Sequence, residues 1–511
     1  MTDGPGSGRD QEARAAELRA HARRGVPYTA VSGLVQIAFA LIGMLLLVRY
    51  LAPDTYGVWV ILVGLAAPLL LVFSMGQLHA LLRFMPALDV AEARRDLLWR
   101  VAIRRLALIA VGLSVLFVAY PLFAERFGIQ GQRAIMAILL PGFVALAAND
   151  YLVAALNVAF RQREVFFATA SQQVVFVGGV ALGIAFEQDL DYFAVVFSLA
   201  AIIQSGIAFT SCVRHFGGPK LEHLRGPLVE AAGQRRYRLT SYVDDVGTML
   251  LSSPVNRLLL AGLANTGEVA IFAVASNIVD RLLALQPIQV FRPIATVSLF
   301  ARYERSGDIS DVNRMFRFIF GVDRSVTMLF LVLFAPLGEP ILSFVFRPEY
   351  AASYAPAVVL IATTALFTMP VGMIAQTLKR PQALVWSKLA IVINLGLGIP
   401  LTVHYGALGM ASAAAISSLA RNAIVFLVLR LEFDLRFPWS TLARYVAAGA
   451  TSMLIIEGLE QIMPLIAAGA IGLVVYAFSL RMFAVLDVSE RALFVSLLPT
   501  RVQDVARRML R

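Results

Sequence analysis

Arginines inside long apolar stretches are the residues of this sequence best suited to binding chemistry. Arg257, Arg281 and Arg421 lie in such stretches, where a charge is costly unless it is paired or in contact with water. Arg292 lies at the end of one, where the alternative is a side chain that extends to the cytoplasmic membrane surface. A guanidinium group keeps its charge in a low dielectric, and its planar donors match two oxygens of a phosphate group. We therefore predict that these four arginines bind the phosphate end of a substrate.

Two polar residues of the first half join this predicted binding set. Gln36 follows Ser32 by four residues in the apolar stretch 26–49, and Arg83 follows His79 by four residues. Residues four apart share one face of a helix, so Gln36 and Ser32 predict a face that contacts a sugar, and Arg83 is predicted to bind substrate from the face that it shares with His79. For Gln36 the alternative is a seam of small residues where two helices pack closely.

A pair of acids, Asp244 and Asp245, lies in the stretch 239–262 and suggests ion coupling. Oxygen-bearing side chains surround Asp245 at helical spacing, namely Ser241, Thr248, Ser252 and Asn256. Oxygen ligands suit a hard cation. We predict that Asp244 or Asp245 carries a coupling Na⁺ or proton; the alternatives are acids that only balance the arginines and a plain hydrogen-bond seam. The neighbours Asp323 and Arg324 are predicted to form a structural ion pair.

The elements that must position these residues are membrane helices. Of the 511 residues 59% are apolar and 15% are charged, and the mean hydropathy is +0.76. Charge at this level cannot cover the surface of several soluble domains, which excludes a soluble enzyme and a disordered protein. The only cysteine, Cys212, excludes a disulfide scaffold, and no metal-ligand cluster or cofactor motif is evident.

Fourteen apolar segments recur along the chain, each long enough to cross a bilayer. Because most are apolar on all sides, they predict helices in lipid, and so an all-α integral membrane protein with 14 transmembrane helices. The segments are 26–49, 57–82, 101–123, 134–158, 165–186, 191–213, 239–262, 268–291, 317–337, 353–376, 384–403, 408–429, 441–457 and 464–486.

The distribution of basic residues predicts the orientation. With a cytoplasmic N-terminus, and with basic residues near the segment ends assigned to the adjoining loops, 35 of the 44 Lys and Arg residues belong to cytoplasmic segments, four to outer segments and five to the spans. Cytoplasmic loops are enriched in Lys and Arg, so both termini are predicted to be cytoplasmic. The net charge of +11 thus reflects topology and does not indicate nucleic-acid binding.

A weak internal repeat predicts two lobes. LAPDTYGV follows the first segment and LANTGEV follows the seventh, with Ala52 and Ala264 separated by 212 residues. Six helices per repeat place both repeats in the same orientation, as parallel lobes with a cleft between them. The predicted parts are a cytoplasmic tail 1–25, an N-lobe 26–213, a cytoplasmic linker 214–237, a C-lobe 238–430, two further helices 431–486 and a cytoplasmic amphipathic tail 487–511.

Four stretches together resemble a known family. They are RYLAPDTYGVWVILVGLAAPLLLVFSMGQLHALLRF (49–84), LLLAGLANTGEVAIFAVASNI (258–278), ILSFVFRPEYAASYAPAVVLI (341–361) and KLAIVINLGLGIPLTVHYGALGMASAAAIS (388–417). Their order and spacing are similar to the polysaccharide-transport, Wzx-type oligosaccharide flippases of the MATE-like (MOP) superfamily. The resemblance spans about 26–486 and implies two MATE-like lobes of six helices and two C-terminal helices.

The resemblance also implies a function. It implies alternating-access flipping of a polyprenyl-pyrophosphate-linked oligosaccharide from the cytoplasmic to the periplasmic leaflet of the bacterial inner membrane, for lipopolysaccharide or other surface polysaccharide. Expected partners are the bilayer, the lipid-linked glycan, a polysaccharide polymerase and glycosyltransferases, with a monomeric transport unit. Lipid II flippases of the superfamily have a sodium site that adds Asn394 and Ser417 as coupling candidates, matched by helix only.

Two other functions remain as alternatives. A MATE-type cation-coupled exporter of drugs or other small molecules belongs to the same superfamily, but it is expected to carry an essential acid in its first helix, where this chain has none. A membrane polymerase or ligase is expected to use a sizeable outer loop, and the predicted outer loops are short. The chain is therefore predicted not to be an enzyme.

Overall fold

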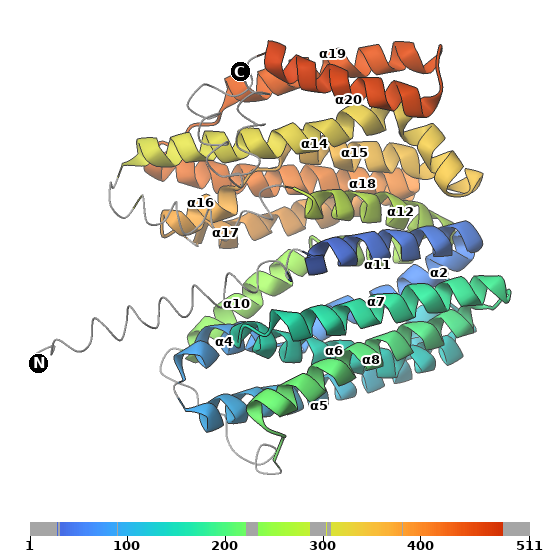
Figure 1. Ribbon diagram of the computed structural model, residues 1–511, viewed down its shortest axis with the longest axis vertical. Helices are drawn as coiled ribbons and strands as arrows, with labels where there is room; N and C mark the ends of the chain where they lie inside the picture. The colour runs from blue at the N-terminus through green and yellow to red at the C-terminus, as the bar shows by residue number, and fades with distance from the viewer. Residues whose placement is uncertain are drawn as a thin grey trace, which may run out of the picture. The chain divides into compact units, whose positions relative to one another are not determined.

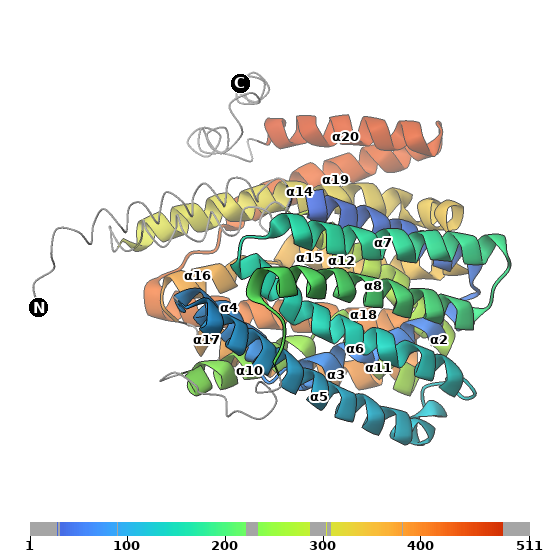
Figure 2. The same ribbon diagram turned by 60° about the horizontal axis from the view of Figure 1, so that its bottom comes forward.

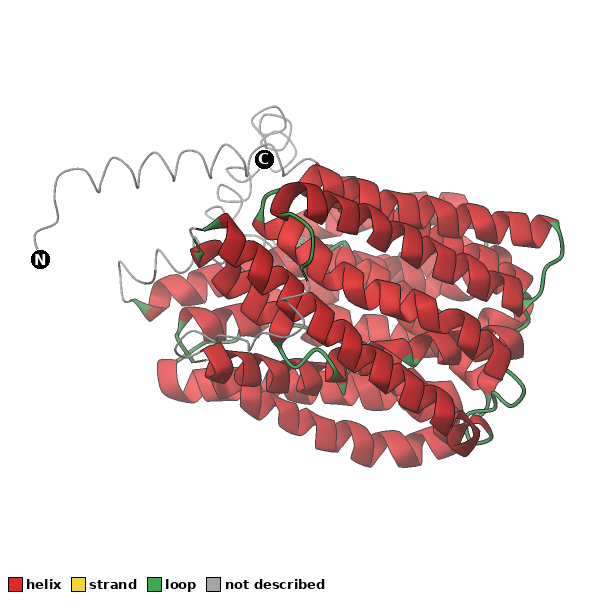
Figure 3. Ribbon diagram, turned by 90° about the horizontal axis from the view of Figure 1, so that it is seen from below, coloured by secondary structure: helices red, strands yellow, loops and turns green. Residues whose placement is uncertain are grey.

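The computed structural model describes residues 31–88, 90–220, 234–286, 308–380 and 382–483, together with Tyr28 and Tyr303. Every regular element within those ranges is a helix (Figure 3), which confirms the all-α class. Several predictions fall outside these ranges: the tail 1–25, most of the linker 214–237, the amphipathic tail 487–511 and Arg292.

The chain forms two compact units, Met1–Met249 and Leu250–Arg511. The first unit begins with an apolar helix over Val31–Tyr50. Its further helices are α2 (Pro53–Gly64), α3 (Ala66–Val72), α4 (Gln77–Phe84), α5 (Ala91–Ala124), α6 (Arg133–Val158), α7 (Gln162–Ala185), α8 (Leu190–Phe216) and α10 (Gln234–Met249).

The second unit is also helical throughout its described part. Its helices are α11 (Ser253–Leu263), α12 (Thr266–Ala284), α14 (Ile309–Val345), α15 (Tyr354–Phe367), α16 (Val371–Thr377), α17 (Gln382–Trp386), α18 (Ala390–Phe433), α19 (Trp439–Glu460) and α20 (Leu465–Met482).

Packing within each unit follows from helices that are apolar on most sides. In the first unit α8 packs against both α6 and α7, as both views show (Figures 1 and 2). Small buried residues such as Gly142 permit this contact, because a Cβ there would lie 2.7 Å from Ser198 Oγ. In the second unit α14 packs against α15, α19 and α20, and α15 packs against α12 and α18.

The number of spans differs from the predicted fourteen. Among the described residues, ten helices are long and apolar enough to cross a membrane, or eleven if the bent pair α10–α11 is one span. The segment 384–403 begins in α17 and continues into α18, which also contains 408–429 and is interrupted at Gly406. The two predicted segments are therefore counted as one candidate span, Gln382–Phe433. The apolar helix at Ile466–Met482 is shorter than a full span. The chain is thus a multi-pass membrane protein, and the count of fourteen remains a prediction.

The predicted helix 239–262 is broken in the structure. Its first part, α10, belongs to the unit that ends at Met249, whereas α11 begins the second unit. Ser252 is extended and Pro254 occupies the first turn of α11. Proline has no N–H to continue the hydrogen bonds of a preceding helix, so the chain stops and restarts there. The two compact units consequently divide inside this segment, beyond the linker 214–237.

The turn within α18 depends on glycine and on an acid from another helix. Gly406 has φ 54° and ψ −130°, a conformation that residues with a Cβ rarely adopt. Glu268, in the first turn of α12, accepts a hydrogen bond of 2.6 Å from the Ala407 N–H. The carboxylate thus holds the backbone where the chain reverses.

Candidate functional site

Arg257 is fixed in place by polar groups of the neighbouring helix. It lies on α11, and its Nε and Nη2 donate to Ser276 Oγ of α12 at 3.2 and 2.8 Å. Nη2 also donates to Asn277 Oδ1 at 2.7 Å. The Arg257 side chain is 13% exposed, so the charge is partly withdrawn from solvent while its orientation is set by α12.

An acid, Asp280, lies near Arg257 but too far away for a hydrogen bond between the two charged groups. Asp280 Oδ2 is 4.0 Å from Arg257 Nη2, and its side chain is 48% exposed. Ser253 Oγ donates to the other carboxylate oxygen at 3.4 Å. The next residue, Arg281, is partly buried. Two arginines and one acid therefore give this region of α11 and α12 an excess of positive charge.

Arg421 belongs to a third helix of the same group. It lies on α18, which packs against both α11 and α12, and its side chain is partly buried. The structure thus places Arg257, Arg281 and Arg421 on three mutually packed helices of the second unit; we call them the arginine set. A positive charge in a low dielectric attracts an anion more strongly than the same charge in water.

A buried hydrogen-bond chain joins two predicted coupling residues. Asn394 Nδ2 donates to Asn256 Oδ1 at 2.9 Å, and Ser417 Oγ donates to Asn394 Oδ1 at 3.3 Å. All three residues are at most 2% exposed. Asn256 is the residue before Arg257 on α11, so the three hydrogen-bonded residues begin next to that arginine. The group contains oxygen atoms of the kind that bind cations, and these atoms already satisfy one another.

Asp245 has a different partner, in the first unit. His79 Nε2 of α4 lies 3.0 and 2.9 Å from the two carboxylate oxygens of Asp245 on α10. Asp244 and Asp245 therefore belong to the unit 1–249, and Asn394 and Ser417 to the unit 250–511. Asp245 is thus hydrogen-bonded within the first unit, and Asn394 and Ser417 are hydrogen-bonded within the second.

The His79–Asp245 contact changes the basicity of the histidine. Helix α4 lies outside the candidate spans. The hydrogen bond that His79 donates to the Asp245 carboxylate raises the pKa of His79 above 6.5, burial opposes the shift, and the charges of Asp245 and Asp244 add to the rise. Because the pKa is raised in the folded state, the pair stabilises the fold below about pH 6.5. The fold loses this contribution as the pH rises through the raised pKa of His79. Both side chains are partly exposed, so the gain is at most about 1 kcal/mol.

The two other predicted binding residues are surface groups of the first unit. Gln36 is exposed on the helix Val31–Tyr50. Arg83 is exposed on α4, where its guanidinium lies 4.2 Å from the ring centre of Tyr237 on α10. This contact between Arg83 and Tyr237 is a cation–π interaction that links α4 to α10. Whether either residue meets a substrate remains a prediction.

Sequence patterns missed one buried arginine of the first unit. Arg105 lies on α5, is 3% exposed, and donates to Leu70 O and Ala147 O at 3.1 and 3.3 Å. It also reaches Asp150 Oδ2 at 3.4 Å and lies 4.3 Å from the ring centre of Tyr151. The sequence feature that could have identified this residue is the position of Arg105 inside the apolar stretch 101–123. Because Arg104 is also basic, the pair resembles the end of a basic loop.

Comparisons with known proteins give a fold. No protein-family model matches the sequence, and no curated protein matches it significantly. The structure of the lipid II flippase MurJ in an inward closed conformation is similar, with a TM-score of 0.70 at 13% identity over 90% of this chain and 98% of that one. An inward-facing multidrug resistance MATE transporter of the MOP superfamily has a TM-score of 0.61 at 14% identity, over 79% and 98% of the two chains.

An outward-facing MATE transporter of the same superfamily has a TM-score of 0.54 at 16% identity, over 80% of this chain and 95% of that one. The matched structures are thus covered almost completely by this chain. At these identities the likeness concerns the arrangement of helices and does not extend to individual site residues. The chain is a multi-pass membrane protein with the fold that MurJ and the MATE transporters of the MOP superfamily share.

Proposed function

We propose that this protein flips a polyprenyl-pyrophosphate-linked oligosaccharide from the cytoplasmic to the periplasmic leaflet of a bacterial inner membrane, by alternating access, for surface polysaccharide synthesis. The observation that carries the proposal is the geometry of Arg257. Its guanidinium is oriented by Ser276 and Asn277 and is only partly exposed. A guanidinium whose orientation is already set loses less entropy when it binds a phosphate oxygen.

Two further observations support an anionic cargo. Arg281 and Arg421 add positive charge on helices packed against α11, which disfavours a cationic drug. Among the similar structures, MurJ is by its name a flippase of a lipid, and it is matched over 90% of this chain. A lipid tail can stay in the bilayer while only the polar head crosses, so a site for the phosphate is the main requirement on the protein.

The experiment that tests this cargo compares two probes in proteoliposomes containing the purified protein. We expect inward-to-outward movement of a fluorescent polyprenyl-pyrophosphate-linked saccharide, and no uptake or export of a cationic dye. Protein-free liposomes and liposomes with heat-denatured protein serve as controls. Movement of the dye but not of the lipid-linked saccharide would instead support the multidrug exporter.

We propose that the transport cycle is coupled to protons through Asp245, with Asp244 as its neighbour. Asp245 has both carboxylate oxygens within hydrogen-bond distance of His79 Nε2. A metal cation at this carboxylate would have to displace the imidazole, whereas a proton can be shared between the two groups. The alternative coupling group is the chain Asn256–Asn394–Ser417, whose oxygens suit Na⁺.

The coupling proposal predicts different responses to two imposed gradients. In proteoliposomes, a pH gradient is expected to accelerate flipping by the wild type, and the Asp245→Asn variant is expected to lose the acceleration while keeping its passive flipping. Asn394→Ala is the matched variant for the sodium group and is expected to keep the response to pH. A response to Na⁺ alone that Asn394→Ala removes would transfer the coupling role to the buried asparagines.

A further inference from the structure

Arg324 is the most completely buried arginine of the described residues, and binding of a substrate anion does not explain its position. It lies on α14 and is 0% exposed. Its neighbour Asp323 is 3% exposed. The nearest approach between the two charges, Nη2 to Oδ2, is 3.9 Å, which is too long for a hydrogen bond. The predicted ion pair exists, but it is not what satisfies the guanidinium.

The guanidinium binds the end of another helix. Arg324 Nη1 donates to Thr364 O and to Ala365 O, each at 2.5 Å. Both carbonyls belong to the last turn of α15, which ends at Phe367. Thr364 O also accepts a backbone hydrogen bond from Thr368 N–H at 3.4 Å. Carbonyls at the C-terminal end of a helix carry partial negative charge. Arg324 therefore provides a full positive charge to this helix end.

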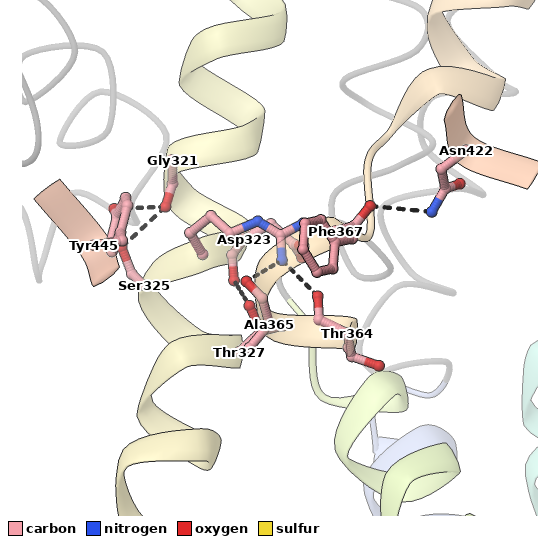
Figure 4. Close-up of polar contacts among 10 residues, drawn as sticks. Gly321, Asp323, Ser325, Thr327, Thr364, Ala365, Phe367, Asn422 and Tyr445 are labelled. Atoms are coloured by element: carbon pink, nitrogen blue, oxygen red, sulfur yellow. Dashed lines mark hydrogen bonds and ion pairs between the residues drawn. The ribbon is translucent and has the colours of Figure 1, made fainter. Parts of the chain in front are cut away.

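The helix ends here because the span from Pro348 to Thr377 is broken. Pro370 cannot donate to Leu366 O, so α15 stops and α16 begins at Val371. Asn422 Nδ2 of α18 donates to Phe367 O, the last carbonyl of α15, at 3.1 Å (Figure 4). Non-helical backbone at membrane depth is tolerated only where protein or water satisfies it, and Arg324 and Asn422 do so.

The surroundings hold Arg324 at this point. The ring of Phe320 lies 4.6 Å from the guanidinium carbon. On the opposite side of α14, Tyr445 of α19 donates to Gly321 O at 2.6 Å and contacts Ser325 Oγ at 2.7 Å (Figure 4). Neither Arg324 Nη2 nor Asp323 Oδ1 has a hydrogen-bond partner in the described part of the protein. The guanidinium of Arg324 therefore interacts mainly with the carbonyls at the end of α15, and part of its hydrogen-bonding capacity is unused.

Carbonyls at a break in a membrane helix are a common place for a mobile cation in transporters. Here two carbonyls and the Asp323 carboxylate surround a charged group that belongs to the chain. We propose that Arg324 is a tethered cation that permanently fills a monovalent-cation site at the broken span, with Asp323 as its counter-charge. The proposal does not depend on the identity of the transported substrate.

The proposal makes a prediction about what happens when the tethered charge is removed. Arg324→Met keeps most of the side-chain volume but leaves the carbonyls and Asp323 without a cation. In choline chloride, whose cation is too large for the site, the midpoint of thermal unfolding in detergent should fall by about 10 °C relative to the wild type. Replacing choline by Na⁺ at about 150 mM should recover a substantial part of this loss in the variant and leave the wild type unchanged.

Two further variants separate a specific site from a general effect of salt. The double variant Asp323→Asn, Arg324→Met lacks the counter-charge, so it should be more stable than Arg324→Met in choline and insensitive to Na⁺. Arg324→Lys keeps a tethered cation and should be stable in choline. Arg430→Met, at an exposed position at the end of α18, is the matched surface control and should behave like the wild type.

Three results would overturn the proposal. The first is an Arg324→Met variant as stable as the wild type in choline. The second is a destabilised variant that Na⁺, K⁺ and Li⁺ all fail to stabilise. The third is a variant that does not accumulate in membranes even though cells contain these ions. Stabilisation of Arg324→Met and of the double variant by the same amount would show a general salt effect and would count equally against it.

Discussion

Flipping of a lipid-linked saccharide is expected to fall at least about 30-fold when Arg257 is replaced by alanine, since truncating one side of a desolvated charge pair costs about 2 kcal/mol or more. Arg257 is 13% exposed, and Ser276 and Asn277 set its orientation. It is the one arginine of α11, so no other side chain of that helix can replace its guanidinium. Arg281→Ala should abolish export similarly, and Arg281→Lys should restore it only in part because an ammonium lacks the planar fork.

The readout for these variants is initial flipping rate in proteoliposomes, normalised to the amount of correctly folded protein. Arg126→Ala, at an exposed site beyond the end of α5, removes the same charge away from the arginine set and should keep the wild-type rate. Ser276→Ala leaves the Arg257 charge but removes its anchor, and should have an intermediate rate. Normal flipping by both Arg257→Ala and Arg281→Ala would show that the arginine set is not the phosphate site.

Gly409→Ala is expected to be the most destabilising single-methyl substitution in α18. A Cβ at Gly409 would lie 1.9 Å from Leu401 O and 2.3 Å from Leu401 C. These are backbone atoms, so they cannot move without opening the turn at Gly406, where Glu268 holds the Ala407 N–H. Overpacking against rigid atoms costs about 3 kcal/mol or more. The midpoint of thermal unfolding in detergent should therefore fall sharply.

The same helix supplies a matched control. Gly396 is exposed and a Cβ there would meet nothing within 4 Å. Alanine favours a helix over glycine by about 1 kcal/mol, so Gly396→Ala should leave the unfolding midpoint unchanged or raise it slightly. If Gly409→Ala and Gly396→Ala unfold at the same temperature, then the two arms of α18 are not as close at Leu401 as the structure has them.

The class of the protein was predictable because hydrophobicity is a local property. Segments of apolar residues predicted an all-helical membrane protein, and the structure confirms this class. Its similarity to MurJ and MATE structures shows the fold that they share. The Wzx-type branch, the glycan, the cytoplasmic termini and the count of fourteen spans stay predictions. Irregular backbone within the helices explains why the number of spans is hard to predict. Pro254 interrupts one predicted helix, and two other predicted helices follow one another in a single helical tract that turns at Gly406.

Composition also located the candidate site only in part. Arg257, Arg281 and Arg421 were recognisable as charges in apolar segments, and the structure places them on helices that pack together. Arg105 and Arg324 look no different in the sequence, yet both bind backbone carbonyls inside the protein. A charge in an apolar segment therefore predicts a polar partner, but the sequence does not say whether that partner is a ligand or the chain itself.

By itself the sequence determined the membrane environment, the helical class and the short list of intramembrane charges. Tertiary structure decided which partner each charge has: His79 for Asp245 across 166 positions, and Asn256 for Asn394 across 138. Such pairs depend on the relative rotation of two helices, and a shift of one residue turns a side chain by about 100°. Hydropathy is insensitive to that rotation, because a helix that is apolar on most sides is equally favourable in lipid in every orientation.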